Sequence, residues 1–138
     1  MRWSLLFMSF LFGCSAQQPS DPAVLQGVVW ISQNASDGKP AASLRFGADG
    51  QVHGNDGCNR LFGQAVVGTR IDLSQVATTR MACMHGRDAA FWAAFAQHDR
   101  WRVRSNELQL LKGKKVIWRL VGEVPESDHL EQEAEEKE

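Results

Sequence analysis

The chain has no apolar run long enough to cross a bilayer as a helix, which takes about 20 consecutive apolar residues. It shows no internal repeat at the periods of solenoid proteins. It also lacks a GxSxG nucleophile elbow and a glycine-rich phosphate loop. These absences weigh against a membrane-spanning helix, a repeat architecture, and the hydrolase and nucleotide-binding classes that those motifs mark.

Groups for other kinds of catalysis are also scarce. Outside the C-terminal segment the acidic residues are mostly turn aspartates, and no pair of carboxylates for glycoside chemistry is evident. A cysteine nucleophile could be drawn from Cys83 and His85, but no third residue that would orient the histidine stands out. We therefore expect no catalytic residues and a protein that is not an enzyme.

Charge is divided unevenly along the 138 residues, whose formal net charge is −1. Positions 123–138 hold eight acidic residues and one lysine, so positions 1–122 are basic. A segment with so few apolar residues cannot bury a core, and we predict that 123–138 is a disordered acidic tail. Its simplest role is solubility, and a sharper hypothesis is that it folds back on a basic face of the domain.

The N-terminus has the pattern of an export signal. Arg2 supplies a positive charge, a short apolar run follows, and the small residue Gly13 precedes Cys14. Positions 11–14 resemble the lipobox of bacterial lipoproteins. This resemblance implies a signal peptide over 1–13, acylation of Cys14 and a tether over 14–23, and Ser15 favours an outer-membrane anchor facing the periplasm. An ordinary cleaved signal with a chance cysteine is the alternative.

Short extended segments dominate the first part of the domain. The first is rich in Val, Ile and Trp, and a loop over 33–40 follows it. Gly47–Gly50 supplies the turn of a hairpin, and 55–57 is a second tight turn. We predict extended segments at 25–32, 42–46, 51–54, 58–67, 69–73 and 75–79.

One helix stands out at 87–98. Its centre, Ala89 to Ala96, is alanine and aromatic on every side, which predicts a buried helix. Phe91 and Phe95 are four residues apart and lie on one stripe. Asp88 suits the positive N-terminal end of the helix, and His98 suits its C-terminal end.

The apolar period then changes from helical to two, which predicts a final meander of three strands with turns at 105–106 and Gly113. Val116, Trp118 and Leu120 are expected to share one face of the last strand. The predicted fold class is α+β, mainly β. We expect a curled antiparallel sheet of seven or eight short strands packed around the one buried helix.

The three cysteines indicate where the protein is located and how its domain could be cross-linked. If Cys14 is acylated, Cys58 and Cys83 remain as a pair in an oxidising compartment, where a disulfide is their simplest use. Two buried free thiols are the alternative. A zinc site formed with His53 and His85 is a third possibility, but the usual finger spacings are missing. We expect no metal and no cofactor.

Two motifs surround these cysteines, GCNRLFG at 57–63 and TTRMAC at 78–83. In this order and spacing they resemble the META domain of the HslJ-like heat-shock lipoproteins, over a domain at 24–122. The resemblance implies an exported or lipid-anchored single domain with a role in envelope stress or tolerance of an aminocoumarin antibiotic, and no established enzymatic activity. The motif residues outside the cysteines are Gly57, Asn59, Arg60, Gly63, Thr79, Arg80 and Met81.

Arginines are the main candidates for binding. Arg60 and Arg80 each lie near a motif cysteine, and the simplest interpretation is structural, with a partner such as Asp56. An anion site near the first motif is the sharper alternative. Asn59 is predicted to support its turn through bonds to the backbone.

A second group of arginines lies on one strand face. The simplest interpretation is a solvated face that protects a sheet edge. The sharper one is a strip that binds lipopolysaccharide phosphate or an acidic envelope partner. Nucleic acid is not expected because the chain is exported. The residues of this possible anion-binding strip are Arg100, Arg102 and Arg104.

Taken together, the sequence indicates a non-catalytic envelope lipoprotein with a stress-related maintenance or binding role. An inhibitor of a cell-wall lytic enzyme is the second hypothesis, and it would require an exposed loop with an acidic or aromatic key. A small enzyme is the third, and it would require a deep polar pocket. The sequence predicts neither a particular partner nor an oligomeric state.

Overall fold

The computed structural model describes residues 20–33 and 40–125. The predicted signal peptide, Cys14 and most of the tether lie outside these residues, as does most of the acidic tail from position 126 on. Among the described residues, no helix is long and apolar enough to cross a membrane.

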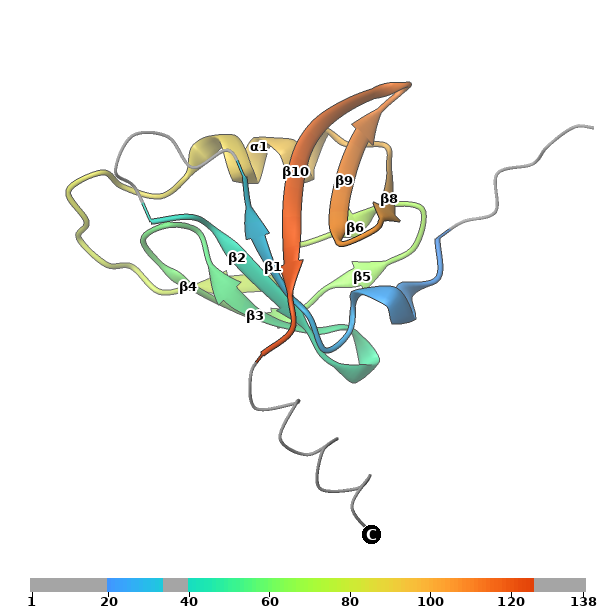
Figure 1. Ribbon diagram of the computed structural model, residues 1–138. Coiled ribbons are helices and arrows are strands. Elements are labelled where there is room, and N and C mark those ends of the chain that lie inside the picture. Colours follow the sequence, from blue (N-terminus) through green and yellow to red (C-terminus); the bar gives the residue numbers. More distant parts are fainter. Residues whose placement is uncertain (1–19, 34–39, 126–138) are drawn as a thin grey trace, which may run out of the picture.

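The core of the fold is one antiparallel sheet of eight strands, in the order β7-β4-β3-β2-β1-β10-β9-β8 (Figure 1). A separate hairpin pairs β5 (Val66–Val67) with β6 (Ile71–Asp72). The strands of the large sheet are β1 (Val29–Ser32), β2 (Ser43–Phe46), β3 (Gln51–Asn55), β4 (Arg60–Gln64), β7 (Val76–Thr78), β8 (Arg100–Arg104), β9 (Glu107–Lys112) and β10 (Lys115–Glu123). The predicted fold class is confirmed.

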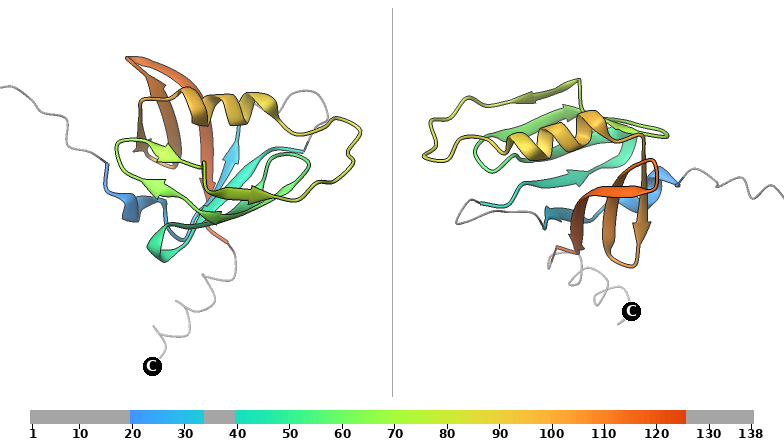
Figure 2. Two further views of the ribbon diagram at one scale, coloured as in Figure 1. Left: turned by 180° about the vertical axis from the view of Figure 1, so that it is seen from behind. Right: turned by 90° about the horizontal axis from the view of Figure 1, so that it is seen from above.

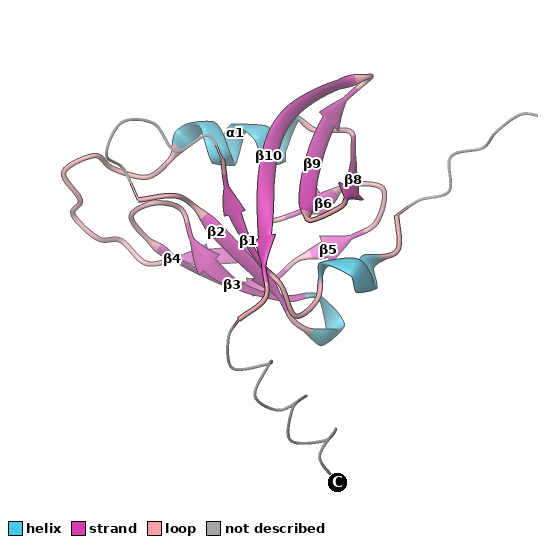
Figure 3. Ribbon diagram, in the orientation of Figure 1, coloured by secondary structure: helices cyan, strands magenta, loops and turns pink. Residues whose placement is uncertain are grey.

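The sheet is strongly bent, with β8–β10 rising beside the one α-helix of the described residues while β2–β4 pass below it (Figures 1 and 2). The helix α1 (Ala89–Gln97) packs against β10, β9 and β6. Apolar side chains from both parts of the sheet meet it and form one continuous core that includes Trp30, Trp101 and Trp118. Figure 3 shows that, apart from α1 and two short 3₁₀ segments at 22–25 and 48–50, the described chain is strand or loop.

Helix α1 is buried on one side only, which corrects the prediction of a helix buried all round. Phe91, Ala94 and Phe95 are buried, whereas Ala90 and Ala96 are exposed. An exposed alanine presents only a methyl group, so the alanine-rich face can meet water at little cost. The Phe91 and Phe95 rings pack 4.9 Å apart, on the predicted stripe.

Both ends of α1 are capped by the residues that the sequence predicted. Asp88 is the N-cap, and its Oδ1 accepts a hydrogen bond from the Phe91 N–H at 3.1 Å. His98 is the C-cap and is buried. Its Nε2 accepts from the Ile71 N–H at 2.9 Å, while Nδ1 lies 2.6 Å from the Phe95 carbonyl oxygen and donates to it. His98 therefore joins the end of α1 to β6.

The structure differs from the sequence prediction in two boundaries and in the register of one strand. Residues 22–25 form a short 3₁₀ helix, so β1 begins only at Val29. Pro22 favours that start because its fixed φ suits the first turn of a helix. The predicted run 58–67 is split at Ala65, whose N–H donates to the Gly50 carbonyl at 2.8 Å instead of extending β4.

The third difference lies in the last strand. The register shifts between Val116 and Trp118, so that Val116 pairs with Leu111 and Trp118 pairs with Leu110. Because neighbouring residues of a strand face opposite sides, Val116 lies on the face opposite to Trp118 and Leu120. The prediction that Val116 shares their face is therefore wrong, and a bulge at Ile117 is the reason.

Candidate functional site

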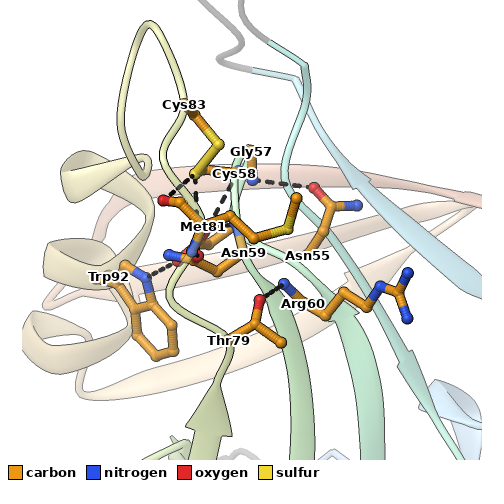
Figure 4. Close-up of a disulfide and its surroundings, with 10 residues drawn as sticks. Asn55, Gly57, Cys58, Asn59, Arg60, Thr79, Met81, Cys83 and Trp92 are labelled. Carbon is orange, nitrogen blue, oxygen red and sulfur yellow. Dashed lines mark hydrogen bonds between the residues drawn. A yellow bond between two sulfur atoms is a disulfide. The ribbon is translucent and has the colours of Figure 1, made fainter.

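The two sequence motifs meet at one end of the sheet, where a disulfide joins Cys58 to Cys83 with a Cα–Cα distance of 5.9 Å (Figure 4). Cys58 lies in the turn between β3 and β4, and Cys83 lies in the loop between β7 and α1. The predicted pairing is confirmed. The bridge fixes the loop that leads into α1 to the β3–β4 hairpin.

Asp56 organises the first motif from the inside. It is fully buried, and its Oδ1 accepts hydrogen bonds from the N–H groups of Cys58, at 3.2 Å, and Asn59, at 2.7 Å. Its Oδ2 accepts from the indole Nε1–H of Trp92 on α1 at 2.9 Å. The backbone carbonyl of Asp56 also accepts from the Asp88 N–H at 2.8 Å. One turn residue thus holds both the turn and the start of the helix.

Direct bonds also join the two motifs. The Asn59 Oδ1 accepts from the Met81 N–H at 2.7 Å, and the Thr79 Oγ1 accepts from the Arg60 N–H at 3.0 Å (Figure 4). The Asn59 side chain does bond to the backbone, as predicted, but its partner is Met81 of the second motif and not its own turn. We call Asp56, Asn59, Thr79 and the two bridged cysteines the motif cluster.

Two motif glycines are explained by the backbone. Gly57 has a φ of +88° and Gly63 a φ of +145°, a region that residues with a side chain rarely adopt. A Cβ on Gly63 would lie 2.9 Å from the Gln75 carbonyl oxygen, in the loop before β7. Gly63 lets β4 and β7 approach closely, and Gly57 lets the turn after β3 pass close to the Pro40 carbonyl oxygen.

The two motif arginines do not take part in this network through their side chains. The expected partner Asp56 is occupied by backbone N–H groups and Trp92. Arg60 and Arg80 are both exposed, and Figure 4 shows the Arg60 side chain directed away from the disulfide. The prediction of an Arg60–Asp56 or Arg80–Asp56 pair is therefore wrong.

The same geometry bears on the metal and cysteine-nucleophile alternatives. Both thiols of the proposed zinc set are used in the bridge, and within residues 20–33 and 40–125 no three His, Cys, Asp or Glu side chains are grouped as metal ligands. Cys83 is likewise not a free nucleophile beside His85. The motif cluster joins the two motifs to each other and to α1.

A basic face covers the outer side of β8–β10. Arg102 donates through Nε to the Gln109 Oε1 at 2.7 Å, and Gln109 donates through Nε2 to the Glu107 Oε1 at 2.6 Å. Glu107 also accepts from the Arg119 Nη1 at 2.7 Å. The basic face comprises Arg100, Arg102, Arg104 and Arg119 with Lys112, Lys114 and Lys115 at the β9–β10 turn.

Two shifted pKa values reflect this crowding. Desolvation lowers the pKa of the Arg102 guanidinium, and the nearby charges of Arg104, Arg100 and Arg119 lower it further. The pKa of Glu107 is lowered by the hydrogen bond from Gln109 and then by the bond from Arg119. Within the described residues, Glu107 is bonded to Arg119 and Asp99 is bonded to the Gly113 N–H beside the same strands, so the four arginines outnumber these two acids.

A groove of about 520 Å³ lies between α1 and the edge strand β7. Trp92 and Phe95 of α1 contribute aromatic walls, and Arg70 and Arg87 lie on its lining at the two ends of the helix. The remaining lining residues are Asp72, Leu73, Ser74, Val76, Thr78 and Ala96.

A family model for the META domain matches residues 24–124. The chain belongs to the META domain family. A solved structure described as the NMR structure of a protein is also similar, with a TM-score of 0.53 at 20% identity. The match covers 75% of this chain and 94% of that one, and it supports the fold alone. No curated protein matches the chain.

Sequence reasoning missed three residues that matter in this META domain. Trp92 lies within the predicted helix, but its bond to Asp56 joins residues 36 positions apart and has no local signal. Arg70 and Arg87 belong to neither motif, and only the packing of α1 beside β7 places them on one groove. The three predicted arginines do lie together on β8.

Proposed function

We propose that the protein is a non-catalytic lipoprotein of the bacterial envelope, anchored through acylated Cys14, whose META domain binds an anionic envelope component with its basic face. The observation that carries this proposal is the excess of positive charge on β8–β10. Four arginines lie on the outer side of these strands, and a glutamine and a glutamate hold two of them in place.

This arrangement supports binding because positively charged side chains on one face attract anionic surfaces, and fixed guanidinium groups lose little freedom when they pair with phosphate oxygens. An anchor in the same membrane would keep the face near lipid phosphate. The stress-related role, including tolerance of an envelope-directed antibiotic, is part of the proposal and rests on the family.

The other two hypotheses receive less support. The loop at 80–87 is exposed along its length, and the Met84 side chain is 97% exposed. It presents methionines and basic residues rather than the acidic or aromatic key expected of an enzyme inhibitor. The groove beside α1 contains two arginines and one aspartate but no histidine or cysteine, which favours binding over catalysis.

The anchor is tested by labelling cells with radioactive palmitate. The wild-type protein should take up label and sediment with outer membranes, whereas Cys14→Ser should do neither. Label retained by the Cys14→Ser variant would contradict the anchor.

The basic face is tested with the processed chain carrying Cys14→Ser, so that no acyl group contributes to binding. It should sediment with phosphatidylglycerol vesicles but not with phosphatidylcholine vesicles, and added salt should release it. The double variant Arg102→Gln/Arg104→Gln should lose most of this binding. The matched control Arg60→Gln/Arg80→Gln removes the same charge elsewhere and should keep it. Equal loss in both variants would point to net charge alone and would refute the proposed face.

The stress-related role is tested in cells. A strain without the protein should be more sensitive to heat or to an envelope-directed antibiotic than its parent. The wild-type gene should restore tolerance and the Arg102→Gln/Arg104→Gln gene should not. Unchanged tolerance in the deletion strain would remove this part of the proposal.

A further inference from the structure

The groove between α1 and β7 exists because the helix does not cover the whole inner side of the sheet. Strand β7 is an edge strand, paired only with β4. Thr78 pairs with the buried Leu61, so Val76 and Thr78 face the inner side. Helix α1 packs mainly against β10, β9 and β6. The apolar inner side of the sheet therefore opens at β7, as it does at the mouths of β-barrels that hold ligands.

The size and shape of this opening suit a small molecule. Its volume of about 520 Å³ falls within the range of roughly 300–1,000 Å³ that is usual for ligand pockets. Arg87 directly precedes the N-cap of α1, and Arg70 binds the other end of the helix. Nine helical residues span about 13 Å, so the groove is elongated with one guanidinium toward each end.

The two arginines differ in their freedom. Arg70 donates through Nη2 to the carbonyl oxygens of Ala96, at 2.9 Å, and Phe95, at 3.4 Å. Arg87 is exposed and has no ion-pair partner in the described part of the chain. Asp72 is the one acid on the lining, and its Oδ1 accepts from the Ser74 N–H at 2.8 Å. Two cations against one acid leave the groove positive.

The aromatic wall is held in place before any ligand arrives. The Trp92 indole is half-buried, and its Nε1–H is fixed by Asp56, which the motif cluster immobilises. The Phe91 and Trp92 rings form a T-shaped pair with centroids 5.6 Å apart. A flat apolar group could stack on such a wall with little loss of side-chain entropy.

We propose that this groove is a binding site for a small amphipathic anion, with a flat ring-bearing body against Trp92 and Phe95 and its anionic group at Arg87. The site is separate from the basic face of β8–β10 and does not depend on the anchor. It also gives the disulfide a functional consequence, because the bridge and Asp56 together set the position of Trp92.

The test uses anilinonaphthalene sulfonate as the probe and N-phenylnaphthylamine as its uncharged counterpart with the same rings. The protein is the processed chain, residues 14–138, with Cys14→Ser, which retains every described element. The sulfonate should bind at a single saturable site and quench tryptophan fluorescence. Arg87→Gln should weaken its binding about fivefold, the upper range for one exposed charge pair, and should leave the uncharged dye unaffected.

The matched control is Arg80→Gln, an exposed arginine of the same loop that does not line the groove. It should bind the sulfonate as the wild type does. Trp92→Leu should weaken both dyes, and its near-ultraviolet circular dichroism would verify that the fold persists. Backbone amide shifts on titration should concentrate in 70–78 and 87–96. Shifts confined to β8–β10, several equivalent dye sites, or equal binding by Arg87→Gln and wild type would overturn the proposal.

Discussion

The Asp56 carboxyl group and the Trp92 indole are joined by a hydrogen bond of 2.9 Å across 36 positions of sequence. Both partners also belong to local structures, the turn after β3 and the helix α1. The bond therefore holds Trp92, which lines the groove, in a fixed position relative to the turn after β3. Its energetic value can be measured directly.

Trp92→Phe removes the indole N–H and keeps an aromatic ring on α1. Hydrogen bonds to a buried carboxyl group contribute about 1.5–3 kcal/mol, and we expect a loss of about that size in the free energy of unfolding. Asp56→Ala should cost more, about 3–4 kcal/mol, because the Cys58 and Asn59 N–H groups also lose their acceptor. Urea denaturation measures both. Additive losses in the double variant would show that the two side chains do not interact.

The disulfide should contribute strongly to stability. Its cysteines are 25 positions apart, and closing a loop of that length is worth about 3.5 kcal/mol on the chain-entropy model. Adding a reductant, or replacing both cysteines with serine, should lower the free energy of unfolding by that amount. In the oxidised protein, alkylation followed by mass spectrometry should find neither Cys58 nor Cys83 modified. Free thiols at both positions would contradict the bridge.

His98 should make stability depend on pH. Burial lowers its pKa below the usual 6.5, and the charge of Arg70 lowers it further, against the opposing effects of the Phe95 carbonyl and Asp99. As the pH falls through about 6.5 the unfolded chain takes up a proton that the folded imidazole does not. Stability should therefore be full above that pH and fall below it, until the folded pKa is reached.

The check on this prediction is His98→Gln, whose side chain does not titrate. It should be less stable than the wild type at neutral pH, because the bonds to Ile71 and Phe95 are disturbed. Its loss of stability between pH 6.5 and mildly acid conditions should be smaller. If the free energy of unfolding of both proteins fell equally with decreasing pH, groups other than His98 would cause the loss of stability in acid.

Gly63→Ala should lower the free energy of unfolding, because β4 and β7 approach each other closely at this position. The positive φ and the 2.9 Å approach of a Cβ to the Gln75 carbonyl oxygen both oppose a side chain, and we expect a loss of about 2–4 kcal/mol. Gly68→Ala is the matched control, since nothing lies within 4 Å of its Cβ position, and its change should stay within about 0.5 kcal/mol. Thermal unfolding compares the two, and similar losses would contradict the steric account.

Local sequence patterns correctly predicted the elements that are determined by residues close together in sequence. The hairpin around Gly47–Gly50 follows from turn residues between apolar segments, and β2 and β3 pair there as expected. The two ends of α1 were located from Asp88 and His98: the Asp88 carboxylate caps the first turn through a hydrogen bond, whereas His98 ends the helix as a buried imidazole bonded to Ile71 and Phe95. Elements that depend on distant partners were harder, such as the split at Ala65, which exists because its N–H bonds back to Gly50.

The candidate sites show the same division. The two short motifs that contain the cysteines indicated where the motif cluster would lie. The alternation of arginine with apolar residues indicated that the arginines of β8 share one face. The partner of Asp56 could not be deduced, because nothing in a turn sequence tells whether its carboxyl group meets an arginine or a tryptophan. The groove was also unforeseen, since it arises where α1 leaves β7 uncovered.

The pairing of β1 with β10 places opposite ends of the domain at the centre of the sheet, with Val29 opposite Glu123. Contacts so distant along the chain form late, because the loop between them must close before they gain anything. A nascent chain halted before β10 would leave β1 and β9 with open edges. The large sheet can therefore be completed only once β10, its last strand in sequence, is available to pair with both β1 and β9.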